Sequence, residues 1–470
     1  MKNNELNRLI KTYQNNEKKP ITFDFKRAYN SLLTVNESNN INYHHLHFYP
    51  GRIYPYIARY LLSLTDIREM NGTLLDPFAG SGTILLESLI NPFISREVLG
   101  VEINPLGRLI SKVKITPFIN ISLVPEYLRE LHKIYSNSSV NIHALIPIYE
   151  NIDMWFSKDA ISKLAKLKYA IQNLEAERDI KDFFWLCFSS IIRKVSKADP
   201  YIPPPVVLKL EKYRDTPKLD KLKEHLERVK SPNLWKIFEE EVLSNCKKLD
   251  GVFDALRDNP TEGKIIWDDA REIKKGTLSE RGFIDKTSSR SLPSNSVSII
   301  FTSPPYLTAQ KYIRTSKLEL LWLGYSIEKI NELEKKSIGT ERIKVSDIEK
   351  LGYKNIDELV EKTLYKSRQR ALAVYFYFKN MIEVIRELNR VLKNQGYMIL
   401  VVGDNKVLGE WIGTYRLLAD IVINESFREL VILKDTIKSR SMLTRRNGSG
   451  GLIKEEYVMI FQKRSEACSK

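Results

Sequence analysis

Short apolar runs and a glycine-rich turn alternate near the start of the chain. The run Gly72-Thr73-Leu74-Leu75-Asp76 leads into a glycine-rich turn, residues 84–89 carry apolar side chains at helical spacing, and 98–102 have the pattern of the next strand. A strand, a glycine turn, a helix and a second strand within about 30 residues predict a βαβ unit. A βαβ unit implies a parallel sheet.

The pattern then changes twice. The apolar spacing in residues 118–260 predicts amphipathic helices, for example at 161–174 and 219–229. The rigid segment Pro200-Tyr201-Ile202-Pro203-Pro204-Pro205 interrupts these helices. From about residue 262, short apolar runs typical of buried strands return. These runs are 264–267, 297–301, 398–402 and 457–461. We therefore expect one α/β domain in two sequence halves with a large helical insertion between them.

The expected organisation has four segments. A polar lead-in, helical or loosely ordered, covers 1–43 and is followed by a first α/β half over 44–117. The helical insertion covers 118–261, and the second α/β half covers 262–470.

Composition narrows the class of protein. The chain has 470 residues, 43% of them hydrophobic and 28% charged, which excludes a disordered or fibrous protein. The formal net charge of +16 favours a polyanionic partner such as nucleic acid, because neutralised phosphates release counterions. A merely soluble basic protein is the alternative that charge alone leaves open.

Cysteine use and hydropathy indicate the compartment. Cys187, Cys246 and Cys468 are too few and too scattered for a disulfide framework or a zinc site, so we expect a reduced cytoplasm and no metal. No apolar run approaches the roughly 18 residues of a membrane span, and the polar opening lacks the apolar stretch of an export signal.

The segment Asp76-Pro77-Phe78-Ala79-Gly80-Ser81-Gly82-Thr83 lies where a predicted strand passes into a helix. Glycines allow a tight turn and a close approach to a ligand that a Cβ would block. Glu102 follows Gly82 by 20 positions, at the tip of the next strand, where an acidic residue reaches the hydroxyls of a ribose. A nucleoside-type cofactor fits this pattern, and a purely structural turn is the alternative. No Gly-Lys-Ser/Thr follows, which argues against a P-loop.

A further acidic candidate is Asp269, which comes after the predicted strand 264–267 and directly follows Asp268. A carboxylate at a strand end can accept a hydrogen bond from an adenine amino group. Either aspartate could equally be the N-cap of a helix starting at Ala270.

Ser303-Pro304-Pro305-Tyr306 directly follows the predicted strand 297–301. Two prolines remove two backbone N–H groups, so Ser303 and Pro304 present oxygen acceptors in a rigid frame beside an aromatic ring. Such acceptors suit an exocyclic amine on a nucleobase: the amine donates to Ser303 Oγ and the Pro304 carbonyl while Tyr306 stacks on the ring. A plain proline turn ending a strand is the alternative. Both turns lie at predicted carboxyl ends of parallel strands, where α/β proteins bind ligands.

Together these motifs resemble the S-adenosylmethionine-dependent DNA amino-methyltransferases, most closely the cytosine-N4 type of the type II restriction-modification methylases. The resemblance covers about 44–115 and 262–462, and includes the segments His47–Pro55, Tyr312–Gly324 and Gly396–Asn405. It implies a Rossmann-like α/β methyltransferase fold with a largely helical insertion.

The resemblance also implies residue roles. Cofactor-binding positions would be Tyr49, Asp76, Pro77, Phe78, Ala79, Gly80, Gly82, Thr83, Glu102 and Asp269. Catalytic positions holding a flipped cytosine would be Ser303, Pro304, Pro305 and Tyr306. Residues 44–117 would be the cofactor-binding half of the methyltransferase domain, and 262–470 would be its catalytic half. The order of the halves implies that the insertion at 118–261 reads the DNA target, although some members of the family read it after the catalytic half.

Three other activities are weighed against this expectation. Carbon-5 cytosine methylation is excluded, because none of the three cysteines follows a proline or lies in a glycine- or proline-rich turn. Adenine-N6 methylation shares the geometry, but that family more often has Asp or Asn where Ser303 stands. A DNA-binding protein that keeps the fold without turnover would explain the charge but not Asp76, Glu102 and Ser303 together.

Basic clusters are candidates for phosphate contacts. They are Arg193, Lys194 and Lys197 in the insertion, and Arg440, Arg445 and Arg446 near a glycine-rich tip at 448–451 that is either a loop closing on DNA or a solvated hairpin. The sequence thus predicts a cytoplasmic, prokaryotic enzyme that methylates cytosine N4 in double-stranded DNA. Its further partner would be a restriction endonuclease acting on the same site.

Overall fold

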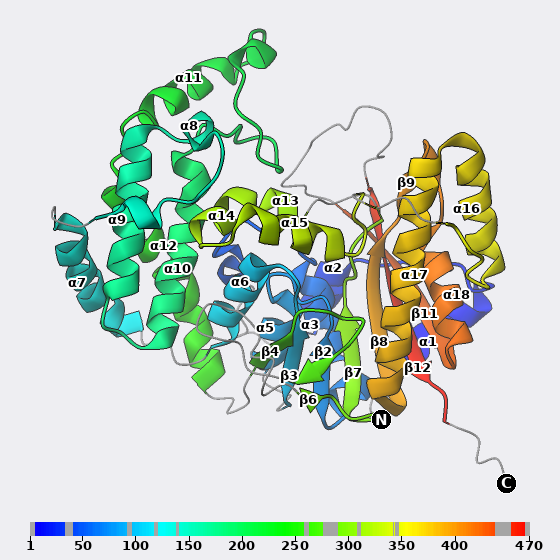
Figure 1. Ribbon diagram of the computed structural model, residues 1–470. Coiled ribbons are helices and arrows are strands. Elements are labelled where there is room, and N and C mark those ends of the chain that lie inside the picture. Colours follow the sequence, from blue (N-terminus) through cyan, green and yellow to red (C-terminus); the bar gives the residue numbers. More distant parts are fainter. Residues whose placement is uncertain are drawn as a thin grey trace.

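The computed structural model describes residues 5–32, 41–91, 96–116, 121–137, 141–257, 263–275, 290–307, 312–341, 343, 347–437 and 453–465. Its centre is an eight-stranded sheet with the strand order β1-β11-β12-β8-β7-β2-β3-β4 (Figure 1). These strands are β1 (Ile21–Thr22), β2 (Thr73–Asp76), β3 (Val98–Val101), β4 (Gly263–Trp267), β7 (Val297–Thr302), β8 (Leu392–Gly403), β11 (Phe427–Thr436) and β12 (Glu455–Lys463). Two small antiparallel pairs, β5 (Lys274–Lys275) with β6 (Arg290–Ser291) and β9 (Lys406–Val407) with β10 (Glu410–Trp411), lie outside it.

Parallel pairing dominates the sheet. β2 is parallel to both β3 and β7, β3 is parallel to β4, and β7 is parallel to β8. Only β12 is antiparallel to its two neighbours within this sheet. The α/β class with a mostly parallel sheet is therefore confirmed, as are the expected strands, which match β2, β3, β4, β7, β8 and β12 with boundaries that differ by a few residues at most of their ends. Because β2, β3, β4 and β7 are adjacent and parallel, their carboxyl ends share one edge.

Helices surround this sheet and extend into a separate group (Figure 1). Those before the insertion are α1 (Glu5–Asn15), α2 (Phe25–Asn30), α3 (Pro55–Ser63), α4 (Thr65–Arg68), α5 (Thr83–Leu89) and α6 (Pro105–Ile115). The insertion contributes α7 (Val124–Ser136), α8 (Ile152–Trp155), α9 (Lys158–Asn173), α10 (Arg178–Ile192), α11 (Leu219–Arg228) and α12 (Leu234–Arg257). The catalytic half adds α13 (Tyr312–Thr315), α14 (Lys317–Trp322), α15 (Ile327–Lys336), α16 (Lys354–Lys366), α17 (Arg368–Val391) and α18 (Thr414–Asn424).

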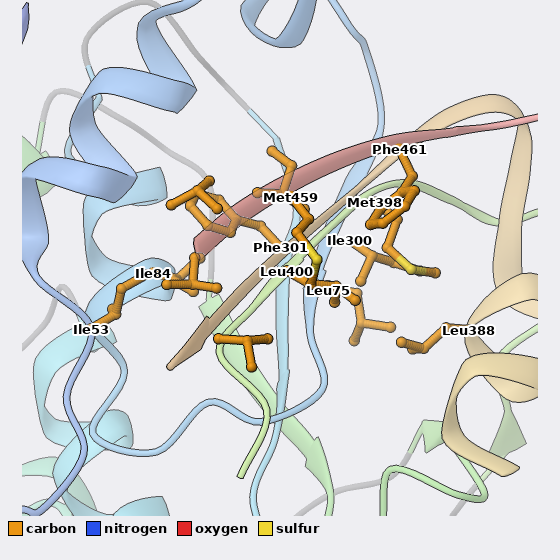
Figure 2. Close-up of a cluster of buried hydrophobic side chains, with 14 of the residues drawn as sticks. Ile53, Leu75, Ile84, Ile300, Phe301, Leu388, Met398, Leu400, Met459 and Phe461 are labelled. Atoms are coloured by element: carbon orange, nitrogen blue, oxygen red, sulfur yellow. The ribbon is translucent and has the colours of Figure 1, made fainter. Parts of the chain in front are cut away.

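The sheet carries a hydrophobic core made from both sequence halves. Leu75 of β2, Ile300 and Phe301 of β7, and Met398 and Leu400 of β8 are all at most 1% exposed. Figure 2 shows these side chains gathered with Met459 and Phe461 of β12 and Leu388 of α17. Burial of such apolar area joins segments that are more than 200 residues apart in the sequence, and it fixes the register of strands that must be covered on both faces.

A second core lies in the helical group, here called the helical lobe and comprising α7 to α12. Phe184 and Phe188 of α10 and Phe238 of α12 are fully buried in it. Trp322 of α14 and Ile313 of α13, from the segment assigned to the catalytic half, belong to the same cluster. Helices α13 to α15 therefore pack with the lobe and lie between it and the sheet (Figure 1). The four-segment division of the chain remains a proposal.

The polar lead-in is more integrated than its composition suggests. α1 buries Leu6, Leu9 and Tyr13, and β1 forms one edge of the sheet, where it pairs in parallel with β11. The Tyr13 hydroxyl donates to Glu429 on β11 at 2.8 Å. Two-residue strands of this kind carry too little pattern to be predicted, because their pairing depends on a partner strand about 400 residues away. In the described part of the chain, every helix is too short or too polar to cross a bilayer.

Candidate active site

Both motif-bearing turns open into one cavity at the carboxyl edge of the sheet. Gly80, from the turn after β2, and Ser303, from the turn after β7, line the same space of about 660 Å³ including its mouth. The other lining residues are Tyr49, Gly51, Pro77, Phe78, Glu102, Ile103, Asp268, Asp269, Ala270, Arg271, Pro305, Tyr312, Lys336, Ser337 and Ile338.

The glycine turn owes its shape to two left-handed residues. Gly80 has φ +53° and Gly82 has φ +73°, a region that favours glycine. A Cβ on Gly82 would come within 3.0 Å of the Ser111 backbone of α6. Substitution at Gly82 would therefore push α6 away from the turn as well as straining the backbone.

Glu102 braces this turn from the end of β3. Its Oε2 accepts the Gly80 N–H at 2.6 Å, and its Oε1 accepts the Asn104 N–H at 2.7 Å and the Tyr49 hydroxyl at 3.4 Å. Burial raises the pKa of Glu102, while the backbone donors oppose that shift. A carboxylate has about four acceptor sites, so Glu102 retains capacity for a hydroxyl donor in the cavity.

Asp76 lies behind the turn and does not line the cavity. Its Oδ1 accepts the Phe78 N–H at 3.1 Å and the Thr302 hydroxyl at 2.6 Å. Because Thr302 immediately precedes Ser303, this contact connects the glycine turn to the Ser303–Tyr306 segment. Burial raises the pKa of Asp76 to about 7. A direct contact between Asp76 and a cofactor stays a prediction.

The acidic pair after β4 lines the same cavity. Asp269 accepts from Arg271 through both carboxylate oxygens, at 2.9 and 2.7 Å, and also accepts the Arg271 N–H at 3.0 Å. A turn follows, so the alternative assignment of Asp269 as a helix N-cap is wrong. Asp268 and Asp269 both interact electrostatically with Lys336. Asp269 therefore enters the cavity already paired with a cation.

Ser303 is fixed by a neighbouring strand. Its hydroxyl donates to the Val401 carbonyl of β8 at 3.0 Å. A hydroxyl has one proton and two lone pairs, so Ser303 Oγ is left as an acceptor. Pro304 is buried, whereas Pro305 lines the cavity beside Ser303.

Tyr306 lines neither of the cavities described here. Its hydroxyl donates to Glu456 on β12 at 2.9 Å. The following residue, Leu307, offers its carbonyl to the Asn405 side chain. The predicted stacking of Tyr306 on a base therefore stays a prediction.

A wider cavity adjoins the first and shares Tyr49 and Gly51 with it. It measures about 1,860 Å³ with its open mouth, and its wall includes Thr83 and Glu456. Of the remaining predicted cofactor positions, Pro77 and Phe78 line the smaller cavity, and the buried Ala79 donates its N–H to Val101 at 2.9 Å. The turn thus contributes to both cavities.

The predicted DNA contacts in the insertion are engaged within the lobe. Arg193 donates to the carbonyls of Pro203, Ile202 and Asp199 at 2.6, 2.5 and 3.1 Å. Lys194 forms an ion pair with Glu241, and Lys197 donates to the Asp153 carbonyl at 2.8 Å. These contacts give Arg193 a structural role, and a DNA contact stays a prediction for all three. Arg440, Arg445 and Arg446 lie outside the described residues.

Several lining residues were not predicted as site residues. Tyr312, Lys336 and Ile338 line the cavity from α13 and from the end of α15. Tyr312 opens the segment that resembles the sequence after the catalytic motif, so its position carried a signal. Lys336 lies in a charge run that predicts an ordinary solvated helix face, and only the packing of α15 against α13 brings it to the cavity.

The molecule is an α/β protein with a cavity at the carboxyl ends of parallel strands, an arrangement consistent with a Rossmann-like methyltransferase fold. Comparison with known proteins agrees. A family described as DNA methylase matches residues 297–468, and a family described as RMKL-like, methyltransferase domain, matches 44–92.

Two relatives extend this match over most of the chain. The Type II methyltransferase M.MvaI of Kocuria varians is 30% identical over 408 residues, covering 82% of this chain and 81% of the relative. The Type II methyltransferase M.BsoBI of Geobacillus stearothermophilus is 26% identical over 270 residues, or 56% of this chain and 49% of the relative. The chain therefore belongs to the DNA methylase family and is a DNA methyltransferase, and this family implies S-adenosylmethionine as methyl donor.

Proposed function

We propose that this protein transfers a methyl group to the N4 amine of cytosine in a specific sequence of double-stranded DNA. The observation that carries the proposal is Ser303 Oγ, held as an acceptor by the Val401 carbonyl in the cavity that also contains Gly80 and Glu102. An acceptor with no proton to offer selects an amine donor. A neutral hydroxyl suffices for cytosine, whereas the adenine-N6 family more often has Asp or Asn at this position.

S-adenosylmethionine suits the smaller cavity. Glu102 would accept from the ribose hydroxyls, and Asp268 or Asp269 would accept from the adenine amine beside the apolar Ile103 and Ile338. The glycine turn and Tyr49 would hold the methionine part. The cofactor supplies an electrophilic methyl group on a sulfonium.

The chain's own residues would act by positioning. Ser303 Oγ and the Pro304 carbonyl accept the two amine protons, which draws the nitrogen lone pair out of conjugation with the ring and fixes its direction. No covalent enzyme intermediate is needed. The amine proton leaves to water, because Ser303 already donates its own proton to Val401.

The biological setting follows from the relatives. Both are type II methyltransferases, so we propose that this protein protects DNA in a prokaryotic cytoplasm against a restriction endonuclease that cuts the same site. The net charge of +16 suits a DNA partner.

Mapping the modified base tests the proposal. The protein is incubated with methyl-labelled cofactor and a pool of mixed-sequence duplexes, which are then digested to nucleosides and analysed by mass spectrometry. We expect labelled N4-methylcytosine. Labelled N6-methyladenine would overturn the base assignment, and duplex retention without label would favour a non-catalytic DNA-binding protein. Ser303→Ala protein purified identically controls for a contaminating methylase.

A further inference from the structure

The Tyr306 side chain is held in a defined position by residues of β8 and β12. A Cβ placed on Gly403, the last residue of β8, would come 2.8 Å from Cε2 and 3.2 Å from Cζ of the Tyr306 ring. The ring therefore packs directly on the backbone of Gly403, where a larger residue would displace it.

The residue that pairs with Gly403 in the sheet binds the hydroxyl of Tyr306. Gly403 pairs with Glu456 across β8 and β12, and Glu456 Oε1 accepts the Tyr306 hydroxyl at 2.9 Å. One residue of the pair thus supports the ring, and its partner binds the hydroxyl. Two angular freedoms of a tyrosine side chain, χ1 and χ2, are restrained by these two contacts.

Glu456 also faces the wider cavity. It lines that cavity together with Asp435, which is its direct partner across β11 and β12. Tyr49 and Gly51 connect this cavity to the one containing Ser303. A nucleotide that enters through the wider cavity would therefore pass Glu456 on its way to the catalytic segment.

We propose that Glu456 is a positioning residue of the methyltransferase, which holds the Tyr306 ring at its hydroxyl so that the catalytic segment receives the target base in one orientation. The inference rests on the proposed function. It concerns base positioning and applies equally whether the methylated base is cytosine or adenine.

The chemistry of Glu456 gives the proposal a pH signature. Burial raises the pKa of Glu456 to about 7, the Tyr306 hydroxyl opposes this shift, and the charge of Asp435 adds to it. An ionised carboxylate is a stronger acceptor for the Tyr306 hydroxyl than the neutral acid. The hydrogen bond from the Tyr306 hydroxyl to Glu456 should therefore strengthen as the pH rises through the Glu456 pKa of about 7.

A double-mutant cycle tests the coupling. Methyl transfer to a duplex carrying the mapped site is measured for wild type, Glu456→Ala, Tyr306→Phe and the double variant. We expect each single variant to lose about tenfold or more in kcat/KM for DNA, the typical effect of losing a hydrogen bond to a charged group. The double variant should lose no more than the worse single variant. Losses that multiply would overturn the proposal.

Conservative and control variants separate positioning from folding. Glu456→Gln keeps an acceptor oxygen and should recover most of the activity lost in Glu456→Ala, but without the rise in kcat/KM between pH 6 and 8 that wild type shows. Glu455→Ala, on the adjacent position of β12, removes a carboxylate that pairs with Lys434 and should leave methyl transfer unchanged. Cofactor affinity by calorimetry should be equal in all variants. A matched loss in Glu455→Ala, or a loss of cofactor affinity in Glu456→Ala, would contradict the role.

A binding readout distinguishes this inference from the proposed function. Fluorescence of an analogue placed at the mapped target base reports extrusion even when no methyl is transferred. We expect Glu456→Ala to bind the duplex with a reduced extrusion signal. An unchanged signal with lost turnover would overturn base positioning by Glu456 while leaving the methyltransferase assignment intact.

Discussion

The sheet region and the helical lobe use their polar side chains in opposite ways. At the sheet edge, Asp76, Glu102 and Ser303 join segments far apart in the chain, and two of them open into a cavity. In the lobe, Arg193 and Lys197 bind carbonyls of the lobe itself. Residues at strand ends are brought together because neighbouring parallel strands share an edge. Charge runs on helices carry no such constraint, so a basic cluster in the sequence is a weak guide to a ligand.

Removal of the Ser303 hydroxyl should have the largest effect. We expect Ser303→Ala to lose roughly 100-fold or more in kcat, comparable to removing one oriented hydrogen-bonding group from an active site. Cofactor affinity should be kept, because Ser303 is expected to contact the base. Single-turnover methyl transfer and calorimetry measure the two quantities. Wild-type turnover in this variant would remove Ser303 from the mechanism.

In the lobe, the substitution that corresponds to Ser303→Ala is Arg193→Ala, which should affect stability. Arg193→Ala removes the guanidinium donor to the carbonyls of Pro203 and Ile202 and one of the donors to the Asp199 carbonyl, so we expect a loss of about 2 kcal/mol or more in the free energy of unfolding. Chemical denaturation measures this value. Lys197→Ala, which removes a single exposed contact, is the matched control. If Arg193→Ala kept full stability but weakened DNA binding, the direct DNA contact would be favoured instead.

Two substitutions of Asp76 distinguish a role in bracing the glycine turn from direct binding of the cofactor. Both of its hydrogen bonds use Oδ1, so Asp76→Asn can keep them while losing the charge, whereas Asp76→Ala loses both. We expect Asp76→Ala to weaken cofactor binding by about tenfold, the effect of roughly one lost hydrogen bond. Calorimetry on both variants decides the cause: an intact affinity in Asp76→Asn assigns Asp76 to bracing, and unchanged affinity in Asp76→Ala would contradict any role in the cofactor site.

A buried carboxyl of α14, a helix that packs against the lobe, gives the smallest expected effect. Burial raises the pKa of Glu319 to about 7, so the folded state binds more protons than the unfolded state between about pH 4.5 and 7. Stability contributed by Glu319 therefore falls as pH rises through this window. Relative to wild type, Glu319→Gln should gain on the order of 1 kcal/mol between pH 5 and 7.5. Urea unfolding at both pH values checks this, and a constant difference between the proteins would refute it.

The sequence predicted those elements whose pattern lies within a few neighbouring residues, and it did not predict those that depend on contacts with distant segments. β2, β3, β4 and β7 were predicted because each is a short apolar run beside a turn. β1 was missed, because two residues carry no pattern and their pairing depends on β11. The helices α13 to α15 were assigned to the catalytic half by position in the chain, yet their apolar faces complete the core of the lobe.

The candidate site divides in the same way. Gly80, Glu102 and Ser303 were predicted because motif spacing places them at strand ends, and all three line one cavity. Lys336 and Glu456 were not, since neither belongs to a motif.

The sequence by itself determined which groups the candidate site contains: two turns, an acidic strand end and a proline-fixed serine, each encoded within a few consecutive residues. Only the tertiary structure decided which donor and acceptor atoms of those groups remain available for a ligand. The Val401 carbonyl accepts the hydrogen bond of the Ser303 hydroxyl, Arg271 pairs with Asp269, and Glu456 accepts the hydrogen bond of the Tyr306 hydroxyl. Such partners come from other strands and turns, and hydrogen-bond capacity is set by three-dimensional contact rather than by residue type.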